Sequence, residues 1–549
     1  MKMLADAPAL QRTCLAGGKQ IPKYGAGGGG MWRLISLPFG LGLFFLAACT
    51  GSGRTTVLDT GTADAAGAID TTGAAETTGP ADLPSGVDIP HDPATRLGPE
   101  NLVYAGAFRL PFVETQPPLT WTWGGRSMTW FAGGDPGSGD TTPGSLFIAG
   151  NDYEDGTSVP RSGFVAELAI PDPVVAQGNL DALPVAKMLQ DFTDVRGPDL
   201  YPEGIYFELP KMGLEVLPGE GDSSILHVAW GQHLENDAAP SACDGPPDAS
   251  CVASQSWRVL GPGGKLDVHP TVGPWWVDGA GLYSVNDYLF AIPQEWADAH
   301  VGGRRLVAGR FRDGGQGSQG PVAVAIAPWQ QGSPPPAGAL LESTVLLHYT
   351  SFPETSGRLN GYQHSDEWVG AAWLAAGSRR ALAFVGTKSI GAHYWYGWQR
   401  CPGGVVPCME PESLGGPGCF DADGSECGFG PEHYCSCTDV DCDPDCFGAR
   451  GWWTEEWQAQ VLLYDPADLE AVAAGLAKPF QPQPYATIVI DDRLFGHEAA
   501  PDVMGSGKQR RFRIGAAACD AQSGILYVTE MNADPTGEQP IVHAWRVQK

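Results

Sequence analysis

The sequence predicts an all-β protein, and within that class a β-propeller of about five blades. Short runs rich in β-branched and aromatic residues recur between turns of Gly, Pro and Asp, and most have the length of strands. Successive runs pair, most clearly in "SGILYVTEMNADPTGEQPIVHAWRV" near the C-terminus. Helical periodicity is clear only at 465–477, where Asp465 is a candidate N-cap. Six or seven blades stay open, and a β-sandwich is the alternative fold.

The composition agrees with this class. The 549 residues include 75 Gly, 47 Pro and 18 Trp but only 17% charged residues, which favours turns and short strands over long helices. The strand-like run "NLVYAGAFRLP" at 101–111 lies far from the last run of the chain, and we expect it to complete the last blade and close the ring. The formal net charge of −30 argues against nucleic acid as a partner, because binding phosphate requires Lys and Arg.

The N-terminal part has the pattern of a targeting segment. From Met31, "MWRLISLPFGLGLFFLAAC" combines a basic start, a short apolar stretch and small residues, which is typical of a secretory signal. The apolar stretch is shorter than the about 20 residues of a comfortable membrane span. We therefore expect 31–48 to be a signal peptide. Residues 1–30 show no apolar period, and the simplest explanations are a start codon assigned too early or disorder.

The motif "LAAC" that ends at Cys49 resembles a bacterial lipobox. The resemblance implies cleavage before Cys49 and a lipid on its sulfur; a plain signal peptide is the alternative. Thr50 rather than Asp after the cysteine favours the outer membrane or the cell surface over the inner membrane. Residues 49–97 are rich in Thr, Ala, Gly and Asp and predict a disordered tether to a propeller domain at 98–549.

The cysteines agree with export. Of 13, eight crowd into an insertion at 401–446, and Cys519 is left over. In an oxidising compartment closely spaced cysteines predict disulfides, although their pairing does not follow from the sequence. Zinc is the alternative, but the spacings lack the CxxC pairs of zinc sites. The expected disulfide cysteines are Cys401, Cys408, Cys419, Cys427, Cys435, Cys437, Cys442 and Cys446, with Cys243 and Cys251 as a further pair.

Several segments together resemble a group of uncharacterised secreted bacterial propeller-like proteins. They are "SLFIAGNDYEDG", "VGAAWLAAGSRRALAFVGTKSIGAHYWYG", "VLLYDPADLEAVAAG" and "AAACDAQSGILYVTEMNADPTGEQPIVHAWRV". The resemblance spans most of 100–549 and implies a fold and an export route. It implies no activity, and so it carries over no catalytic residues.

Candidate site residues follow from the fold, because propeller sites usually lie on loops at the mouth of the central channel. The candidates for catalysis are Asp152, Glu203, His364, His393 and Glu530. Carboxylates that converge over an aromatic platform could act as acid and base on a glycosidic bond. The alternatives are carboxylates that cap turns and histidines that are buried hydrogen-bonding groups. The two histidines could also bind a transition metal.

The Cys-rich insertion also carries alternating acidic residues, which suit a hard cation such as Ca²⁺. The candidate ligands are Asp421, Asp423, Asp439, Asp441 and Asp443. No complete EF-hand pattern is present, and a solvated acidic loop is the alternative.

The sequence leaves two functions of different class. The favoured hypothesis is a lipid-anchored binding or scaffold protein of the cell surface, with the membrane as one partner and a glycan or a protein as its ligand. The alternative is a carbohydrate-active enzyme, a glycoside hydrolase or lyase. Whether the protein is an enzyme stays open at this point.

Overall fold

The computed structural model describes most of residues 91–549. The described ranges are 91–114, 119–136, 141–151, 163–195, 211–231, 255–277, 287–310, 317–326, 334–337, 339–352, 354–394, 398–399, 419–420, 435–436, 452–496, 507–511 and 513–549. The chain divides into two units, Met1–Pro80 and Ala81–Lys549, and every described residue belongs to the second.

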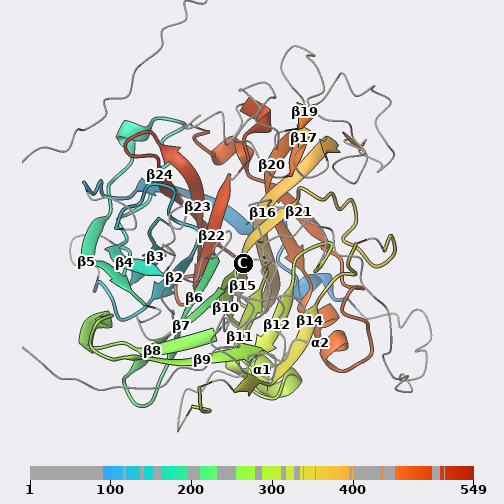
Figure 1. Ribbon diagram of the computed structural model, residues 1–549, viewed down its shortest axis with the longest axis horizontal. Helices are drawn as coiled ribbons and strands as arrows, with labels where there is room; N and C mark the ends of the chain where they lie inside the picture. The colour runs from blue at the N-terminus through green and yellow to red at the C-terminus, as the bar shows by residue number, and fades with distance from the viewer. Residues whose placement is uncertain are drawn as a thin grey trace, which may run out of the picture. The chain divides into compact units, whose positions relative to one another are not determined.

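Five antiparallel sheets form a five-bladed β-propeller, which confirms the predicted fold class (Figure 1). Each sheet has one strand next to the centre, and these inner strands contact one another in the order β2, β6, β10, β15, β22 and back to β2. The inner strands are β2 (Met128–Phe131), β6 (Lys211–Pro218), β10 (Tyr288–Ala291), β15 (Glu367–Ala376) and β22 (Ile514–Asp520).

In blades 1 to 4 the strands follow the chain outward from the inner strand. Blade 1 continues with β3 (Ser145–Ala149), β4 (Phe164–Ala169) and β5 (Lys187–Asp194). Blade 2 continues with β7 (Ser224–Gly231), β8 (Gln255–Val259) and β9 (Thr271–Val277), with β13 (Leu340–Leu341) parallel to β9. Blade 3 continues with β11 (Leu306–Gly309), β12 (Ala323–Ile326) and β14 (Ser343–Leu347). Blade 4 continues with β16 (Arg379–Tyr394), β20 (Trp453–Tyr464) and β21 (Ala486–Val489), with β18 (Cys419–Phe420) beside β16. Strands β17 (Trp398–Gln399) and β19 (Cys435–Ser436) form a separate pair.

Blade 5 joins the two ends of the propeller domain. Strands β22, β23 (Ile525–Asp534) and β24 (Gln539–Val547) come from the C-terminal end, and β1 (Leu102–Arg109) adds the outermost strand from the N-terminal end. Strand β1 pairs with β24 in antiparallel register, with Phe108 opposite Val542. The prediction that 101–111 closes the ring is therefore confirmed.

The two α-helices are in the connections between successive strands, and both lie on one face of the propeller. Helix α2 (Pro466–Ala473) begins after Asp465, whose side chain accepts a hydrogen bond from the Ala467 backbone at 2.9 Å, and this confirms the predicted N-cap. Helix α1 (Gln294–His300) was not predicted, since seven residues give too little periodicity. Shorter 3-10 turns are at Pro93–Thr95, Pro99–Asn101, Leu180–Ala182, Pro262–Gly264, Asp491–Arg493 and Gly507–Gln509.

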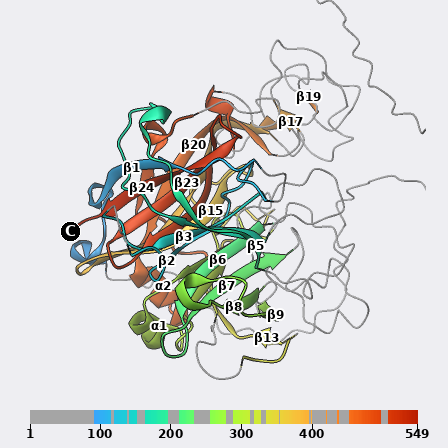
Figure 2. The same ribbon diagram turned by 90° about the vertical axis from the view of Figure 1, so that its left-hand side faces the viewer.

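The positions of the helices distinguish two faces of the propeller (Figure 2). We call the face that carries α1 and α2 the helix face. The opposite face, where β16 ends and β20 begins on either side of the Cys-rich insertion, is the insertion face. Each inner strand starts at the insertion face and runs toward the helix face, so residues just before an inner strand belong to the insertion face.

The core consists of five apolar layers, one between each pair of neighbouring blades. Going around the ring from the blade 1–2 layer, each is represented by one fully or almost fully buried residue: Phe147, Leu289, Phe384, Leu463 and Tyr527. Burial of a Leu or Phe side chain contributes about 1.5–3 kcal/mol. Because a blade is covered on both faces, some strands are continuous apolar runs, as in β12, where all four residues are buried and apolar.

Candidate functional site

Of the predicted site residues, three lie among the described residues and the others lie outside them. His364, His393 and Glu530 are described, whereas Asp152, Glu203 and Cys49 are not. The candidate calcium ligands and the cysteines of the insertion also lie outside, apart from the strand positions of Cys419 and Cys435. The leftover Cys519 is on β22, and it is free. The disulfides, the lipid site and calcium therefore stay predictions.

His364 and His393 lie together at the insertion face of blade 4, with their ring centroids 6.2 Å apart. His364 precedes the inner strand β15. His393 is near the end of β16, just after Gly391, where the pairing with β20 is irregular and the backbone has a φ of 77°. That left-handed conformation favours glycine, so Gly391 sets the bulge that places His393.

Aromatic rings surround His364. The Trp452 ring stacks on it with centroids 5.2 Å apart and an interplanar angle of 26°. Phe352 and Tyr362 meet the same imidazole edge-on, at 5.2 Å and 5.8 Å. Trp452 is buried, His364 and Tyr362 are half-buried, and Phe352 is 45% exposed. We call His364, His393, Trp452, Phe352 and Tyr362 the blade 4 cluster.

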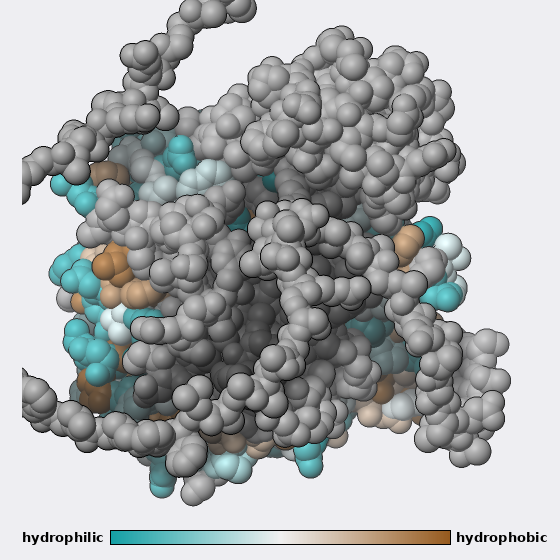
Figure 3. Space-filling view, in the orientation of Figure 1, coloured by the Kyte–Doolittle hydropathy of each residue, from teal (hydrophilic) through white to brown (hydrophobic). Residues whose placement is uncertain are grey.

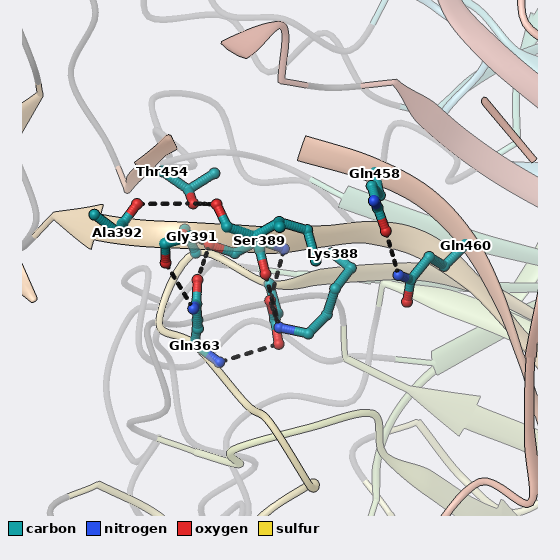
Figure 4. A network of polar contacts seen from close by, with 11 residues as sticks. Gln363, Lys388, Ser389, Gly391, Ala392, Thr454, Gln458 and Gln460 are labelled. Atoms are coloured by element: carbon teal, nitrogen blue, oxygen red, sulfur yellow. Dashed lines mark hydrogen bonds and ion pairs between the residues drawn. The ribbon is translucent and has the colours of Figure 1, made fainter. Parts of the chain in front are cut away.

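A network of hydrogen bonds supports the blade 4 cluster from within the blade (Figure 4). Lys388 Nζ lies 2.9 Å from Asp366 Oδ1, which also accepts from the Ser389 backbone N–H at 2.9 Å. The Ser389 hydroxyl donates to the side-chain oxygen of Gln363 and accepts from Ser365 at 2.7 Å. Burial raises the pKa of Asp366, and the facing Lys388 charge opposes this. The carboxylate is thus engaged in holding the segment that carries His364.

His393 is a neutral imidazole. Burial lowers its pKa to about 3, and the nearby His364 and Lys388 act in the same direction. No group of three or more His, Cys, Asp or Glu side chains in the described part of the chain is placed to hold a metal ion. The blade 4 cluster therefore offers two imidazoles and aromatic surface, and the Asp366 carboxylate in the supporting network is already paired.

Glu530 has other partners, in blade 5. Its Oε2 lies 3.0 Å from His543 Nε2, and its two oxygens accept the Phe495 and Gly496 backbone N–H groups, each at 2.8 Å. The Tyr104 hydroxyl reaches His543 Nδ1 at 3.0 Å. Burial alone would raise the pKa of Glu530, but these hydrogen bonds and the positive charges nearby hold it below its usual value. The structure thus brings His364 and His393 together, and it gives Glu530 a role in joining β23, β24 and the segment before β22.

Sequence reasoning missed the partners of the blade 4 cluster and a second glutamate–histidine pair. Trp452 and Phe352 stand far from His364 in sequence, and no local spacing links them to it. The second pair is Glu215 on β6 and His227 on β7, directly opposite each other in the sheet. The sequence did contain a signal for this pair, because each residue interrupts an otherwise apolar strand, in "GLEVL" and "ILHVAW".

Comparisons with known proteins identify no family for this chain. No family model matches the chain, and no curated protein matches its sequence. One similar solved structure is that of a "putative glycoside hydrolase" from Parabacteroides distasonis, with 9% identity and a TM-score of 0.33 over 85% of this chain and 96% of that chain. Within the described part of the chain, no helix has both the length and the apolar character that a membrane crossing requires.

Proposed function

We propose that this propeller is a non-catalytic binding protein and that the blade 4 cluster forms part of its ligand site. The observation that carries the proposal is the exposed ring of Phe352 against His364, next to a polar network whose groups are bonded to one another. Exposed aromatic rings stack on the apolar faces of sugars and on partner side chains, and they contribute without proton transfer. A glycan is the ligand class that we favour.

Two of the described carboxylates, those of Asp366 and Glu530, favour binding over hydrolysis. A glycosidase needs two carboxyl groups that are free to act on the same bond. Asp366 is held by Lys388 and by backbone N–H groups, and Glu530 is held by His543 and two backbone N–H groups. Neither is a free acid or base in this arrangement.

A glycan array followed by an assay for released sugar tests this proposal. Wild-type protein should bind a subset of glycans without turnover. Phe352→Ala should weaken that binding about tenfold or more, in line with the loss of an aromatic contact. The matched control is Phe112→Ala, since Phe112 is 54% exposed in a segment that adjoins blade 5 instead. Release of sugar would contradict the proposal, and so would equal binding by wild type and Phe352→Ala.

We further propose that the protein is exported and anchored by a lipid on Cys49. The support is the motif "LAAC" and the tether-like composition of 49–97. Labelling of cells with a radioactive fatty acid should mark the wild-type protein and leave Cys49→Ser unlabelled. Label that persists in Cys49→Ser would refute the anchor and would leave the binding proposal untouched.

A further inference from the structure

Three side chains lie next to one another across the strands of blade 2, and the two nearest the centre of the propeller are polar. Glu215 on β6 is opposite His227 on β7, and His227 is opposite Trp257 on β8. Alternation along the strands puts these three on the face that packs against blade 3, together with Leu217 and Ala229 of the blade 2–3 layer. The corresponding row of blade 4, on its face toward blade 5, is Ala372, Ala383 and Leu463, and it is entirely apolar. Blade 2 therefore buries a glutamate and a histidine where an apolar row also fits.

A third polar group comes from blade 3. Strand β6 approaches β10 so closely at Gly213 that a Cβ there would lie 2.6 Å from the Tyr288 carbonyl carbon. Glu215 is two residues further along and on the same face. On the blade 3 side, the Ile292 backbone N–H donates to the Arg305 carbonyl at 2.9 Å, which extends the β10–β11 ladder to Arg305. The Arg305 charge acts on the pKa values of both Glu215 and His227.

The three groups have few partners among the described residues. His227 is only 5% exposed, yet its Nε2 has no hydrogen-bond partner there, and neither has the buried Nε of Arg305. Glu215 accepts one hydrogen bond, from Thr129 Oγ1 at 3.2 Å. Buried polar atoms in proteins are nearly always paired, so unpaired ones point to something that the protein binds. Glu215 and Arg305 are half-buried.

We propose that Glu215, His227 and Arg305, which we call the blade 2–3 site, bind a small oxyanion such as a carboxylate or inorganic phosphate. Arg305 supplies a positive charge and an unpaired N–H donor. Neutral His227 can supply an N–H, and a protonated Glu215 an O–H. All three then donate, which is the complement of a ligand with anionic oxygens. This site is separate from the blade 4 cluster, and it does not rest on the proposed function.

The protonation states agree with that assignment. Burial raises the pKa of Glu215 to about 8, with Thr129 and Arg305 opposing the shift, so the carboxyl is neutral at pH 7. Burial and then Arg305 lower the pKa of His227 to about 3. Among the other titratable groups here, Glu215 contributes to the raised pKa of Cys519, and Glu295 and Asp298 of α1 act on the pKa of Arg305. Ionisation of Glu215 above pH 8 would place a second negative charge against the ligand and weaken its binding.

Thermal unfolding with added salts tests the proposal, with sodium acetate and sodium phosphate as probes and sodium chloride at equal ionic strength as the reference. At pH 6.5, acetate or phosphate should raise the midpoint temperature in a saturable way that chloride does not reproduce. A response to acetate alone identifies a carboxylate site, and a response to phosphate alone identifies a phosphate site. Above pH 8 the apparent Kd should rise about tenfold per pH unit, as the protonated fraction of Glu215 falls.

Two substitutions separate this site from general salt effects. Arg305→Gln should abolish the response, whereas Arg304→Gln should keep it, because the Arg304 Nη atoms are bonded to Val301 and Glu342, and the charge that acts on Glu215 and His227 is that of Arg305. Glu215→Gln should bind without the loss above pH 8, and this variant keeps the test valid if Arg305→Gln does not fold. The proposal fails if wild type shows no stabilisation specific to an oxyanion, which would leave water as the occupant. It also fails if Glu215→Gln loses binding with pH as wild type does.

Discussion

The propeller contains two glutamate–histidine pairs. Their surroundings shift the pKa values of the two glutamates in opposite directions. In blade 5, Glu530 and His543 are 3.0 Å apart, and the backbone supplies two further N–H donors to the carboxylate. In blade 2, Glu215 and His227 are neighbours in the sheet but are not hydrogen-bonded to each other, and the His227 Nε2 has no partner among the described residues. The same two residue types are thus hydrogen-bonded to each other in one blade and not in the other.

The comparison shows that partners, and not burial alone, decide the charge of a buried carboxyl group. Burial raises the pKa in both cases. For Glu530, the His543 hydrogen bond, the His543 and Arg510 charges and the Phe495 N–H outweigh burial, and the pKa falls below its ordinary value of 4.5. For Glu215, one hydroxyl and the Arg305 charge do not outweigh it, and the pKa rises to about 8. We therefore conclude that Glu530 stabilises the fold, whereas Glu215 belongs to the proposed blade 2–3 site.

Glu530→Gln should have the largest effect on stability. It removes a buried carboxylate that is hydrogen-bonded to His543 and to two backbone N–H groups and that lies 3.9 Å from Arg510, so we expect a loss of about 3–5 kcal/mol at pH 7. Because the folded pKa of Glu530 is lowered, its contribution is complete above pH 4.5 and is lost as the pH falls through the lower folded value. Urea unfolding at several pH values measures this. An unchanged midpoint at pH 7 would show that the blade 5 pair is not structural.

Glu215→Gln should act in the opposite direction. The folded pKa of Glu215 is raised, so its cost to stability appears as the pH rises above 4.5 and is complete above about 8. Removal of the ionisable group should therefore stabilise the protein by about 1–3 kcal/mol at pH 8 and change little at pH 4. The same unfolding series, run without added oxyanions, measures it. Glu220→Gln, at an exposed turn of the same blade, is the control and should change nothing. A destabilised Glu215→Gln at pH 8 would contradict the account.

Tyr104→Phe should give a smaller loss. It removes the hydroxyl at 3.0 Å from His543 Nδ1 but keeps the ring against Trp545, whose centroid is 5.3 Å away. A single hydrogen bond of this kind contributes about 1 kcal/mol. In the Glu530→Gln background the effect of Tyr104→Phe should shrink, because His543 then lacks its anion. Equal effects in both backgrounds would show that the two contacts are independent.

Much of the fold could be predicted from the sequence, and the reason is physical. Blades covered on both sides produce apolar runs of strand length, and β3 and β12 show this pattern clearly. The closing strand at 101–111 followed from the need of a propeller to leave no open edge. The Asp465 cap followed from local chemistry. Helix α1 did not, because seven residues between two short strands carry almost no pattern.

Much less of the candidate site could be predicted. His364 and His393 were singled out as polar residues near strand ends, and they do lie together. Trp452 and Phe352 join them only through folding, because they reach His364 from two other segments of the chain. Glu530 was expected at a channel mouth, but its partners are His543 and the backbone N–H groups of Phe495 and Gly496, and local reasoning links it to none of them. Glu215 was overlooked because it lies within a strand and not on a loop.

The protonation of Glu215 is the central claim, and infrared spectroscopy tests it most directly. At pH 7 and without added oxyanions, the wild-type spectrum should contain a carbonyl stretch from a protonated carboxylic acid. The difference spectrum against Glu215→Gln should show that band, and the difference against Glu530→Gln should show only loss of a carboxylate. A carboxylate loss in both difference spectra would mean that Glu215 is ionised, and it would contradict the contrast between the two pairs.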